Sequence, residues 1–377
     1  MSKYDALIVG YYGMKNSGDD MLFYATIKGA HEELGLNKFA VSSASELYHN
    51  NQYDVSLVLP EKQLFRGHNR LNLYTAALMS KHIFFGGGSV LHSYRDIQIK
   101  RHLMKLASSN EHAALGVSIG PFRSSQTERE CAKFLNECTL TGVRDSDSLD
   151  IAKSIAPNAA VVPTFDLALS QLSHKLEKFN VPFQRRIIGV CLCPTDELQH
   201  GQDLKTRRIQ TIIDSLKRIP KSNYDEIWLI DFNGHPNLGD YPIHLPIYTA
   251  LKRHTNVRHF HYDSNPWHVV SLIRQCSVTI CMRLHASIFS YMTGTPAINI
   301  CYHKKCWEWS RSIEMDQRFI FPSNDFSAND LLNRLEQVLN GDYPEPSLTV
   351  KTANQYSMKN WRLHHEYNIP VGSHSPL

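Results

Sequence analysis

Short apolar runs alternate with amphipathic, helix-like segments along most of the chain, and this alternation limits the fold more than any other feature. The segments between the runs are long enough to carry the chain from one parallel strand to the next. In the first half, we expect strands at 6–9, 39–42, 55–59, 82–85, 114–119, 140–143 and 160–163, and helices at 20–34, 97–107 and 128–138. The pattern is typical of a parallel β-sheet covered by helices on both faces.

A polar stretch without strand character, Ser170 to Arg186, interrupts the alternation, which then restarts at Ile187. We therefore predict an α/β protein with two Rossmann-like domains, residues 1–175 and 185–345, each with a parallel sheet and with a cleft between them. A helix and tail over residues 346–377 are expected to pack back onto the sheets. The length of 377 residues suits two domains of ordinary size.

Composition narrows the function classes. The chain is 42% hydrophobic and 20% charged, as ordinary globular proteins are, and its net charge of +4 comes without a block of Lys or Arg. We therefore expect no nucleic-acid partner. No signal-peptide pattern and no apolar run of about 18 residues is present, which predicts a cytoplasmic protein without a membrane span. Peripheral membrane association is left open.

Metal-binding motifs are missing from the sequence. The 20 histidines are scattered without HExxH or paired CxxC spacing, so a zinc site would have to be assembled from distant parts of the chain. The eight cysteines lie mostly in apolar runs, where they act as small hydrophobic residues. We expect reduced thiols and no metal or other cofactor.

Ligands of open α/β sheets collect at the carboxyl ends of the strands. After the first strand, "GYYGMKNSGDD" enters a helix, and Asp19 and Asp20 either cap it or bind substrate hydroxyls. The next candidate, "FFGGGSVLHSY", carries three glycines whose N–H groups could form an anion-binding concavity; a tight turn is the alternative. We favour the first interpretation for the glycines.

Two charged residues follow later strands of the first half. Arg144 in "TGVRDSDSLD" leaves a strand end while Asp145 or Ser146 provides a helix cap, and we prefer a ligand-binding arginine to a surface pair with Asp145. Asp166 in "VPTFDLAL" either orients a sugar hydroxyl or forms a salt bridge with an arginine.

The stretch "SVTICMRLHASIFSYMTGTPAINICYHKK" places Arg283 and His285 where a strand meets a helix. Cations there oppose the helix dipole by about 0.3–1 kcal/mol, and neither Arg283 nor Leu284 is a capping residue. A second basic cluster, "HKK" at 303–305, ends the next strand. We interpret the combination as an anion pocket whose ligand need not be protein.

These segments, in this order, resemble the polysaccharide pyruvyl transferase family. The resemblance extends from about Tyr11 to Trp309, and its most specific part is "RLHASIFSYMTGTPAINICYHKK"; the other segments are "GYYGMKNSGDDMLFYA", "FFGGGSVL", "GVSIGP", "GVRDSDSL" and "PTFDLAL". The resemblance implies an architecture similar to GT-B glycosyltransferases, with the first domain on the acceptor side and the second on the donor side. It also implies transfer of pyruvate from phosphoenolpyruvate to two hydroxyls of a sugar, which gives a cyclic ketal and phosphate.

The resemblance further implies roles for individual residues. Phosphoenolpyruvate carries two anionic groups, which suit the matching arginines, Arg144 and Arg283. His285 matches the family's candidate general acid, which would protonate either C3 of the enol or the leaving phosphate. Asp166 or Asp20 is the candidate base that would accept the protons of the sugar hydroxyls. Donor binding would also involve Leu284, Lys304, Gly87 and Gly88, and acceptor binding would involve Asn16, Asp19, Asp20 and His92. His92 departs from the family pattern, which has an acidic residue at this point.

The expected acceptor is a sugar of a cell-surface polysaccharide or of its lipid-linked oligosaccharide precursor. Two alternatives stay open at this stage. One is a glycosyltransferase of the same architecture with a nucleotide-sugar donor, and the other is a non-catalytic glycan-binding relative. The compact "MRLHAS" pocket, with lysines after the next strand, fits a small dianion better than a nucleotide.

Overall fold

A computed structural model describes residues 2–49, 51–172, 186–194 and 201–366, without the side chains of 201–203 and 362–366. The chain divides into two compact units. The first comprises Met1–Met14, Asp19–Gln171 and Lys351–Leu377, and the second comprises Lys15–Gly18 and Leu172–Val350. The domain bounds expected from the sequence stay a prediction, and most of the expected boundary stretch, residues 173–185, lies outside the described residues.

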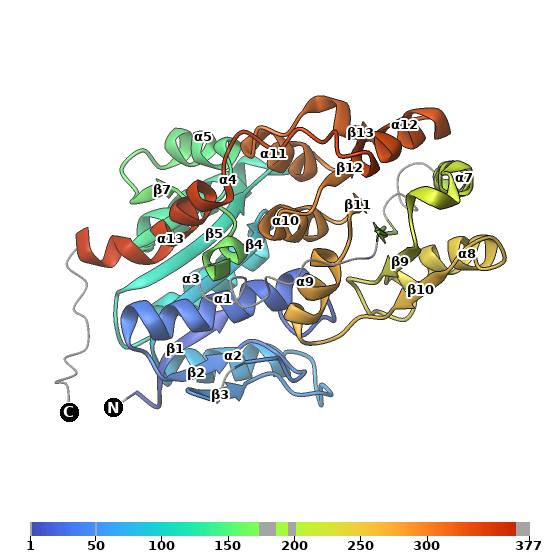
Figure 1. Ribbon diagram of the computed structural model, residues 1–377. Helices are drawn as coiled ribbons and strands as arrows, with labels where there is room; N and C mark the ends of the chain where they lie inside the picture. Colours follow the sequence, from blue (N-terminus) through green and yellow to red (C-terminus); the bar gives the residue numbers. More distant parts are fainter. Residues whose placement is uncertain (1, 50, 173–185, 195–200, 367–377) are drawn as a thin grey trace. The chain divides into compact units, whose positions relative to one another are not determined.

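The sheet of the first unit is built from seven strands in the order β3-β2-β1-β4-β5-β6-β7, and every pairing is parallel. Helices connect the strands, as Figure 1 shows. The strands are β1 Tyr4–Val9, β2 Lys38–Val41, β3 Asp54–Leu57, β4 Ser80–Leu91, β5 His112–Ile119, β6 Leu140–Val143 and β7 Val161–Pro163. The helices are α1 Ser17–Leu34, α2 His68–Leu78, α3 Tyr94–Leu106, α4 Ser125–Glu137, α5 Ser146–Ile155 and α13 Val350–Glu366.

This sheet is buried on both faces because its strands are apolar at successive positions. In β1, Leu7 and Val9 join the core cluster that includes α3, α4 and α5, whereas Ala6 and Ile8 join the cluster formed with α1. Trp361 of α13 lies in the second cluster, and a β-carbon at Gly29 of α1 would lie 2.2 Å from its ring. The C-terminal helix therefore completes one face of the first sheet.

The second unit contains a six-stranded parallel sheet in the order β10-β9-β8-β11-β12-β13. This is the Rossmann order, in which successive strands are added outward on one side of β8 and then, from β11 on, outward on the other side. The strands are β8 Ile187–Cys191, β9 Glu226–Ile230, β10 Val257–Phe260, β11 Val278–Cys281, β12 Ala297–Cys301 and β13 Ile320–Pro322. The helices are α7 Gly201–Arg218, α8 Tyr241–Leu251, α9 Pro266–Arg274, α10 Leu284–Thr293, α11 Lys304–Ser312 and α12 Ala328–Leu339.

The expected α/β class with two Rossmann-like parallel sheets is confirmed. Two details of the sequence prediction are wrong. The first is that β4 does not end before the glycines but continues through them to Leu91. The second concerns α8: the sequence pattern predicts a helix over residues 246–254, whereas the helix begins at Tyr241, with Pro242 in its first turn and Pro246 inside it. A first-turn proline needs no N–H partner, which makes Pro242 the better start signal.

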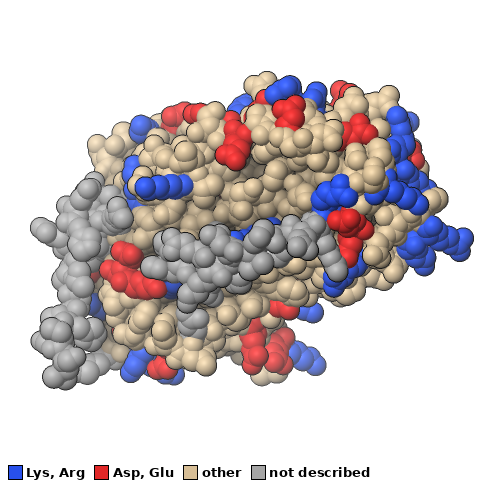
Figure 2. Space-filling model, in the orientation of Figure 1, with Lys and Arg blue, Asp and Glu red and all other residues tan. Residues whose placement is uncertain are grey.

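The described surface carries both signs of charge. Figure 2 shows Lys and Arg side chains mixed with Asp and Glu on the visible face. None of the helices in the described part of the chain has the length and hydropathy to span a bilayer.

Candidate active site

The carboxyl end of β11 lies at the point where the strand order of the second sheet reverses, and α10 begins three residues later. Arg283 is the N-cap residue of α10, and its side chain makes no capping hydrogen bond. The helix start thus lacks a side-chain cap, as the sequence predicts. Its first-turn N–H groups carry the positive end of the helix dipole, which favours an anion.

The anion that binds Arg283, however, belongs to the protein. Arg283 Nε lies 3.1 and 3.2 Å from the two carboxylate oxygens of Asp240, and Nη2 also donates to Asp240 Oδ1. Asp240 is fully buried and also accepts from the backbone N–H groups of Phe232 (2.9 Å) and Asn233 (3.0 Å). Burial alone would lower the pKa of Arg283, but the charge of Asp240 raises it. Arg283 therefore has a protein carboxylate as its partner, a contact that the sequence pattern does not reveal.

The ion pair fixes the plane of the guanidinium group without using all of its donors. Within the described residues, no hydrogen-bond partner is found for Arg283 Nη1. Tyr302 and Cys193 lie close by: burial raises the pKa of Cys193 to about 12, and burial also raises the pKa of Tyr302. Both groups are therefore neutral at physiological pH, and Cys193 is no thiolate nucleophile.

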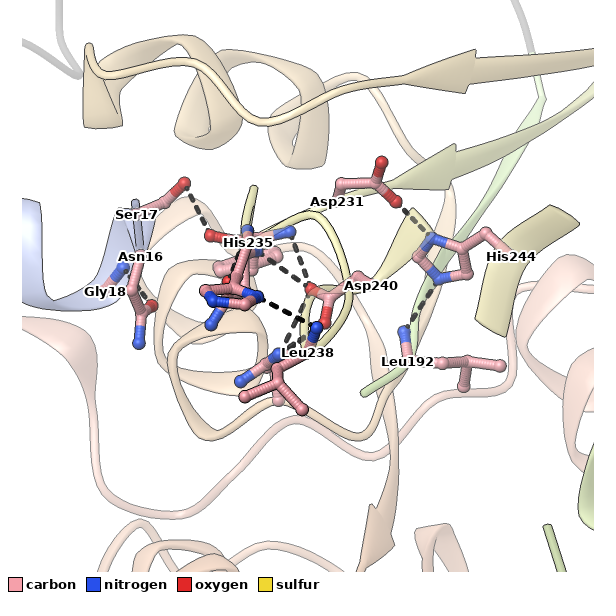
Figure 3. A network of polar contacts seen from close by, with 12 residues as sticks. Asn16, Ser17, Gly18, Leu192, Asp231, His235, Leu238, Asp240 and His244 are labelled. Carbon is pink, nitrogen blue, oxygen red and sulfur yellow. Dashed lines mark hydrogen bonds and ion pairs between the residues drawn. The ribbon is translucent and has the colours of Figure 1, made fainter. Parts of the chain in front are cut away.

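His285 lies in the first turn of α10 and packs against Gly18. A β-carbon at Gly18 would lie 2.1 Å from Nδ1 of His285, so only glycine allows this approach. Phe289, one helical turn along, also contacts this ring, with 5.9 Å between the ring centroids. Ser17 and Asn16 support this segment: the Ser17 hydroxyl donates to the carbonyl of Phe232 (3.3 Å), and Asn16 Oδ1 accepts from the Gly18 N–H (3.2 Å) (Figure 3).

Lys304 and its neighbours have contacts of their own on α11. Lys304 forms an ion pair with Glu308 (3.3 Å) one turn along the helix, and its side chain is 68% exposed. The His303 ring accepts from the Lys305 N–H (3.3 Å) and caps the helix. Burial and the nearby Lys305 lower the pKa of His303, so this imidazole is neutral at physiological pH. Lys304 and His303 of the second basic cluster thus already have contacts within α11, which the sequence does not indicate.

Arg144 and Asp166 pair within the first unit. Arg144 Nη1 donates to Asp166 Oδ2 (2.8 Å), and its Nε donates to the hydroxyl of Ser118 (2.8 Å). Asp166 is 2% exposed, and its Oδ1 also accepts from the Ala168 N–H (3.1 Å). Of the two interpretations left open for Asp166, the structure has the salt bridge. Asp145 caps α5 and accepts from Ser118, so the Arg144–Asp145 surface pair is not observed.

The glycine motif is packed beneath α1. A β-carbon at Gly86 would lie 2.1 Å from the hydroxyl oxygen of Thr26 and 2.4 Å from that of Tyr12, and one at Gly87 would lie 2.8 Å from Leu22. The Tyr12 hydroxyl donates to the Gly86 carbonyl (2.6 Å). Close helix–sheet packing therefore accounts for Gly86 and Gly87. Gly88 has a positive φ, and a β-carbon at this position would lie no closer than 3.8 Å to another side chain.

The expected acceptor residues do not lie together in one unit. Asn16 belongs to the second unit, whereas Asp19, Asp20 and His92 belong to the first. Asp19 and Asp20 lie in the first turn of α1, where negative charge suits the helix dipole, and Asp20 is buried. His92 is exposed just after β4. The roles of these residues, and of Leu284 and Lys304, stay predictions.

Comparison with known proteins agrees with the motifs. The model of the family described as polysaccharide pyruvyl transferase matches residues 16–304, which include both arginines and His285. The chain belongs to the polysaccharide pyruvyl transferase family. No curated protein is significantly similar to it in sequence.

Solved structures place this family member among GT-B-type folds. A UDP-GlcNAc 2-epimerase from Neisseria meningitidis bound to UDP-GlcNAc is 12% identical, with a TM-score of 0.61 over 97% of this chain and 99% of that chain. A putative UDP-N-acetylglucosamine 2-epimerase from Listeria monocytogenes is 8% identical, with a TM-score of 0.60 over 99% and 100%. Anabaena HepE in complex with UDP and glucose is 11% identical, with a TM-score of 0.57 over 97% and 100%. At these identities, the similarity concerns the fold alone.

Sequence reasoning missed two residues that shape the site of this pyruvyl transferase family member. Asp240 precedes α8 by one residue and looks like an ordinary helix cap, although it makes no capping hydrogen bond with its side chain. From the sequence, Gly18 is interpreted as an ordinary residue of the first helix, without a role in packing. The available signal for Gly18 was a glycine in the first turn of a helix, where it costs helix stability and needs a reason.

Proposed function

We propose that this family member transfers pyruvate from phosphoenolpyruvate to two hydroxyls of a sugar, forming a cyclic ketal and releasing phosphate. The observation that carries the proposal is the start of α10 in the second unit. An uncapped helix N-terminus, the Nη1 of Arg283 and the imidazole of His285 occur there within three consecutive residues. A small ligand with a phosphate and a carboxylate matches this set of donors.

Each group of this set has a role in the proposed reaction. Arg283 binds one anionic group of the donor through Nη1, while Asp240 keeps the guanidinium in place. The helix N–H groups bind the other anionic group. His285 supplies or accepts protons through the nitrogens of its ring. Gly18 and Phe289 hold its ring and thereby limit the entropy lost on binding.

The reaction balances without an additional reactant. A proton is added to C3 of the enol, the first sugar hydroxyl bonds to C2, and the C2–O bond to phosphate breaks. The second hydroxyl then bonds to C2 and closes the ketal. Of the two protons lost by the sugar hydroxyls, one replaces that taken up at C3 and the other leaves on phosphate. No metal is required by this scheme.

The proposed test is incubation of the purified chain with phosphoenolpyruvate and a panel of galactosides, glucosides and mannosides. Phosphate release and a product mass that fits a pyruvate ketal are expected for at least one sugar. Arg283→Lys should weaken donor binding, because a lysine loses the bidentate contact to Asp240 and the planar Nη1. The matched control is Arg318→Lys at the exposed Arg318–Asp316 pair, which has the same Arg–Asp chemistry. Equal donor affinity in both variants would contradict the proposal.

A nucleotide-sugar glycosyltransferase is the second candidate. It is favoured by the fold of the solved structures, of which one is described with UDP and glucose and another with UDP-GlcNAc. Ligands that bind only the native state raise its melting temperature. Phosphoenolpyruvate, but not UDP or GDP, should therefore stabilise the chain. Stabilisation by a nucleotide alone would favour the glycosyltransferase, and stabilisation by neither would leave the non-catalytic glycan-binding relative as the better interpretation.

A further inference from the structure

A second cluster of chemical groups lies elsewhere in the second unit, at the carboxyl ends of β9 and β10. Asp231 directly follows β9, His259 lies in β10 and His261 follows it. The two strands pair in parallel with Phe260 opposite Ile230, and the Asp231 N–H donates to the Phe260 carbonyl (2.9 Å). Because alternate residues of a strand share one face, His259 and His261 both lie on the side of Asp231.

The three side chains present their ligand atoms to one another. The Nε2 of His259 lies 2.8 Å from Oδ1 of Asp231, and the Nδ1 of His261 lies 3.2 Å from Oδ2. One ligand atom from each of the three lies within 4.8 Å of the others. Around a tetrahedral Zn²⁺ with bonds of about 2.0–2.1 Å, ligand atoms are about 3.3 Å apart. Small side-chain adjustments would thus admit an ion.

A third histidine, His244, holds the carboxylate of Asp231 in place through a hydrogen bond. His244 is fully buried, and its Nδ1 lies 2.6 Å from Oδ1 of Asp231 (Figure 3). Its Nε2 accepts from the backbone N–H of Leu192 (3.0 Å), so the proton must be on Nδ1, which donates to Asp231. A partner of this kind, hydrogen-bonded to a ligand but not itself bound to the ion, is a regular part of metal sites in proteins.

Burial and stacking give the cluster one rigid side and one open side. The Asp231 side chain is 2% exposed and that of His259 is 9% exposed. The His259 ring stacks on Tyr241 with centroids 5.3 Å apart and the planes within 5°. The His261 side chain is 65% exposed. An ion could therefore reach the site from solvent at His261 and meet two ligands that are already held in place.

We propose that Asp231, His259 and His261 bind one Zn²⁺ ion. Two imidazole nitrogens and a carboxylate oxygen favour zinc and similar divalent ions over Mg²⁺ and Ca²⁺, which prefer oxygen ligands. Three protein ligands leave a coordination position for water or for an anionic ligand. The alternative is a hydrogen-bond network that uses Asp231 as a shared acceptor and binds no metal. This proposal does not depend on the proposed transferase function.

The test is titration of the metal-free full-length chain with Zn²⁺ against a chromophoric chelator. We expect uptake of one tight equivalent. His261→Ala should weaken the affinity at least about 100-fold, because it removes one of three ligands. The control is His254→Ala, which removes an exposed histidine of the same unit outside the cluster and should change nothing. His261 is the primary target because its side chain is exposed and contributes little to the packed core, and circular dichroism verifies the fold.

Co²⁺ provides the second readout. The ion should give the visible d–d bands of a four-coordinate site without thiolate charge-transfer bands, since the proposed ligands include no cysteine. Asp231→Asn should abolish these bands while retaining a hydrogen-bond acceptor for His244. The proposal is overturned if the chain takes up no tight equivalent of zinc, or if His261→Ala and His254→Ala bind zinc equally well. Loss of zinc binding with intact phosphate release would leave the proposed function unaffected.

Discussion

Arg283 and Asp240 form a buried bidentate ion pair although they are 43 positions apart in the sequence. The pair joins the start of α10 to the start of α8, next to the central strands of the second sheet. It therefore serves two purposes in this unit. It satisfies a fully buried carboxylate, and it holds a guanidinium beside an uncapped helix N-terminus.

The first prediction concerns the stability of this pair. Arg283→Ala should lower the free energy of unfolding by about 3–5 kcal/mol, because it leaves the charge of Asp240 buried without its partner. Denaturant unfolding followed by circular dichroism is the measurement. Arg318→Ala is the control: the Arg318–Asp316 pair has nearly the same geometry but is exposed, so its loss should barely change the transition. Equal effects of the two substitutions would contradict the role of burial.

The second prediction concerns Gly18 and His285. Gly18→Ala should reduce turnover at least about 10-fold without removing any functional group, because the added β-carbon displaces the His285 ring. Turnover with phosphoenolpyruvate is measured in Gly18→Ala, His285→Gln and the double variant. If Gly18 acts through His285, the alanine should have little further effect in the glutamine background. If the losses of turnover in the two single variants add up in the double variant, Gly18 has a role that does not depend on His285.

The third prediction separates packing from ligand binding in the glycine motif. Gly86→Ala should destabilise the first unit by about 1–3 kcal/mol, because its β-carbon would overlap Thr26 and Tyr12. Gly88→Ala meets no close side chain, and its cost should be limited to about 1 kcal/mol for the left-handed backbone. Melting temperature and donor affinity are measured for both variants. A loss of donor affinity in the stable Gly88→Ala variant would restore the anion-binding interpretation.

The fourth prediction is an acid sensitivity of the first unit. Burial, and then the neighbouring His82, lower the pKa of His112 from 6.5 to about 4, and its Nδ1 accepts from the Ile83 N–H (3.2 Å). The unfolded chain therefore binds a proton below pH 6.5 that the folded chain binds only near pH 4. Stability contributed by neutral His112 is complete above pH 6.5 and decreases as the pH falls toward 4.

His112→Asn tests this linkage, because asparagine keeps an acceptor for Ile83 and does not titrate. The loss of unfolding free energy between pH 7 and pH 5 should be smaller in this variant by about 1–2 kcal/mol. His254→Asn, at an exposed position, should leave the pH dependence unchanged. The same pH dependence in His112→Asn and in the unmodified chain would exclude His112 as its source.

Local pattern was sufficient for the architecture. Alternating apolar runs and amphipathic segments predict two parallel sheets covered by helices, because strand and helix periodicity depend on residues near one another in the chain. The same local pattern shows that no capping side chain is available at Arg283, which the structure confirms. Family membership also follows from motifs that are continuous in the sequence, above all the segment from Arg283 to Lys305.

What the sequence could not provide is the identity of distant partners. Three questions depend on contacts between residues 22 to 74 positions apart in the sequence. They are whether Arg144 binds a ligand or Asp166, whether the glycines bind an anion or allow a helix to pack closely, and whether Arg283 pairs with a carboxylate of the protein. The proposed zinc site of Asp231, His259 and His261 would be a similar case, since its residues come from the ends of two strands. Parallel sheets bring the ends of separate strands together at one edge, so the chemistry at that edge is decided by strand order and register, which only the folded chain possesses.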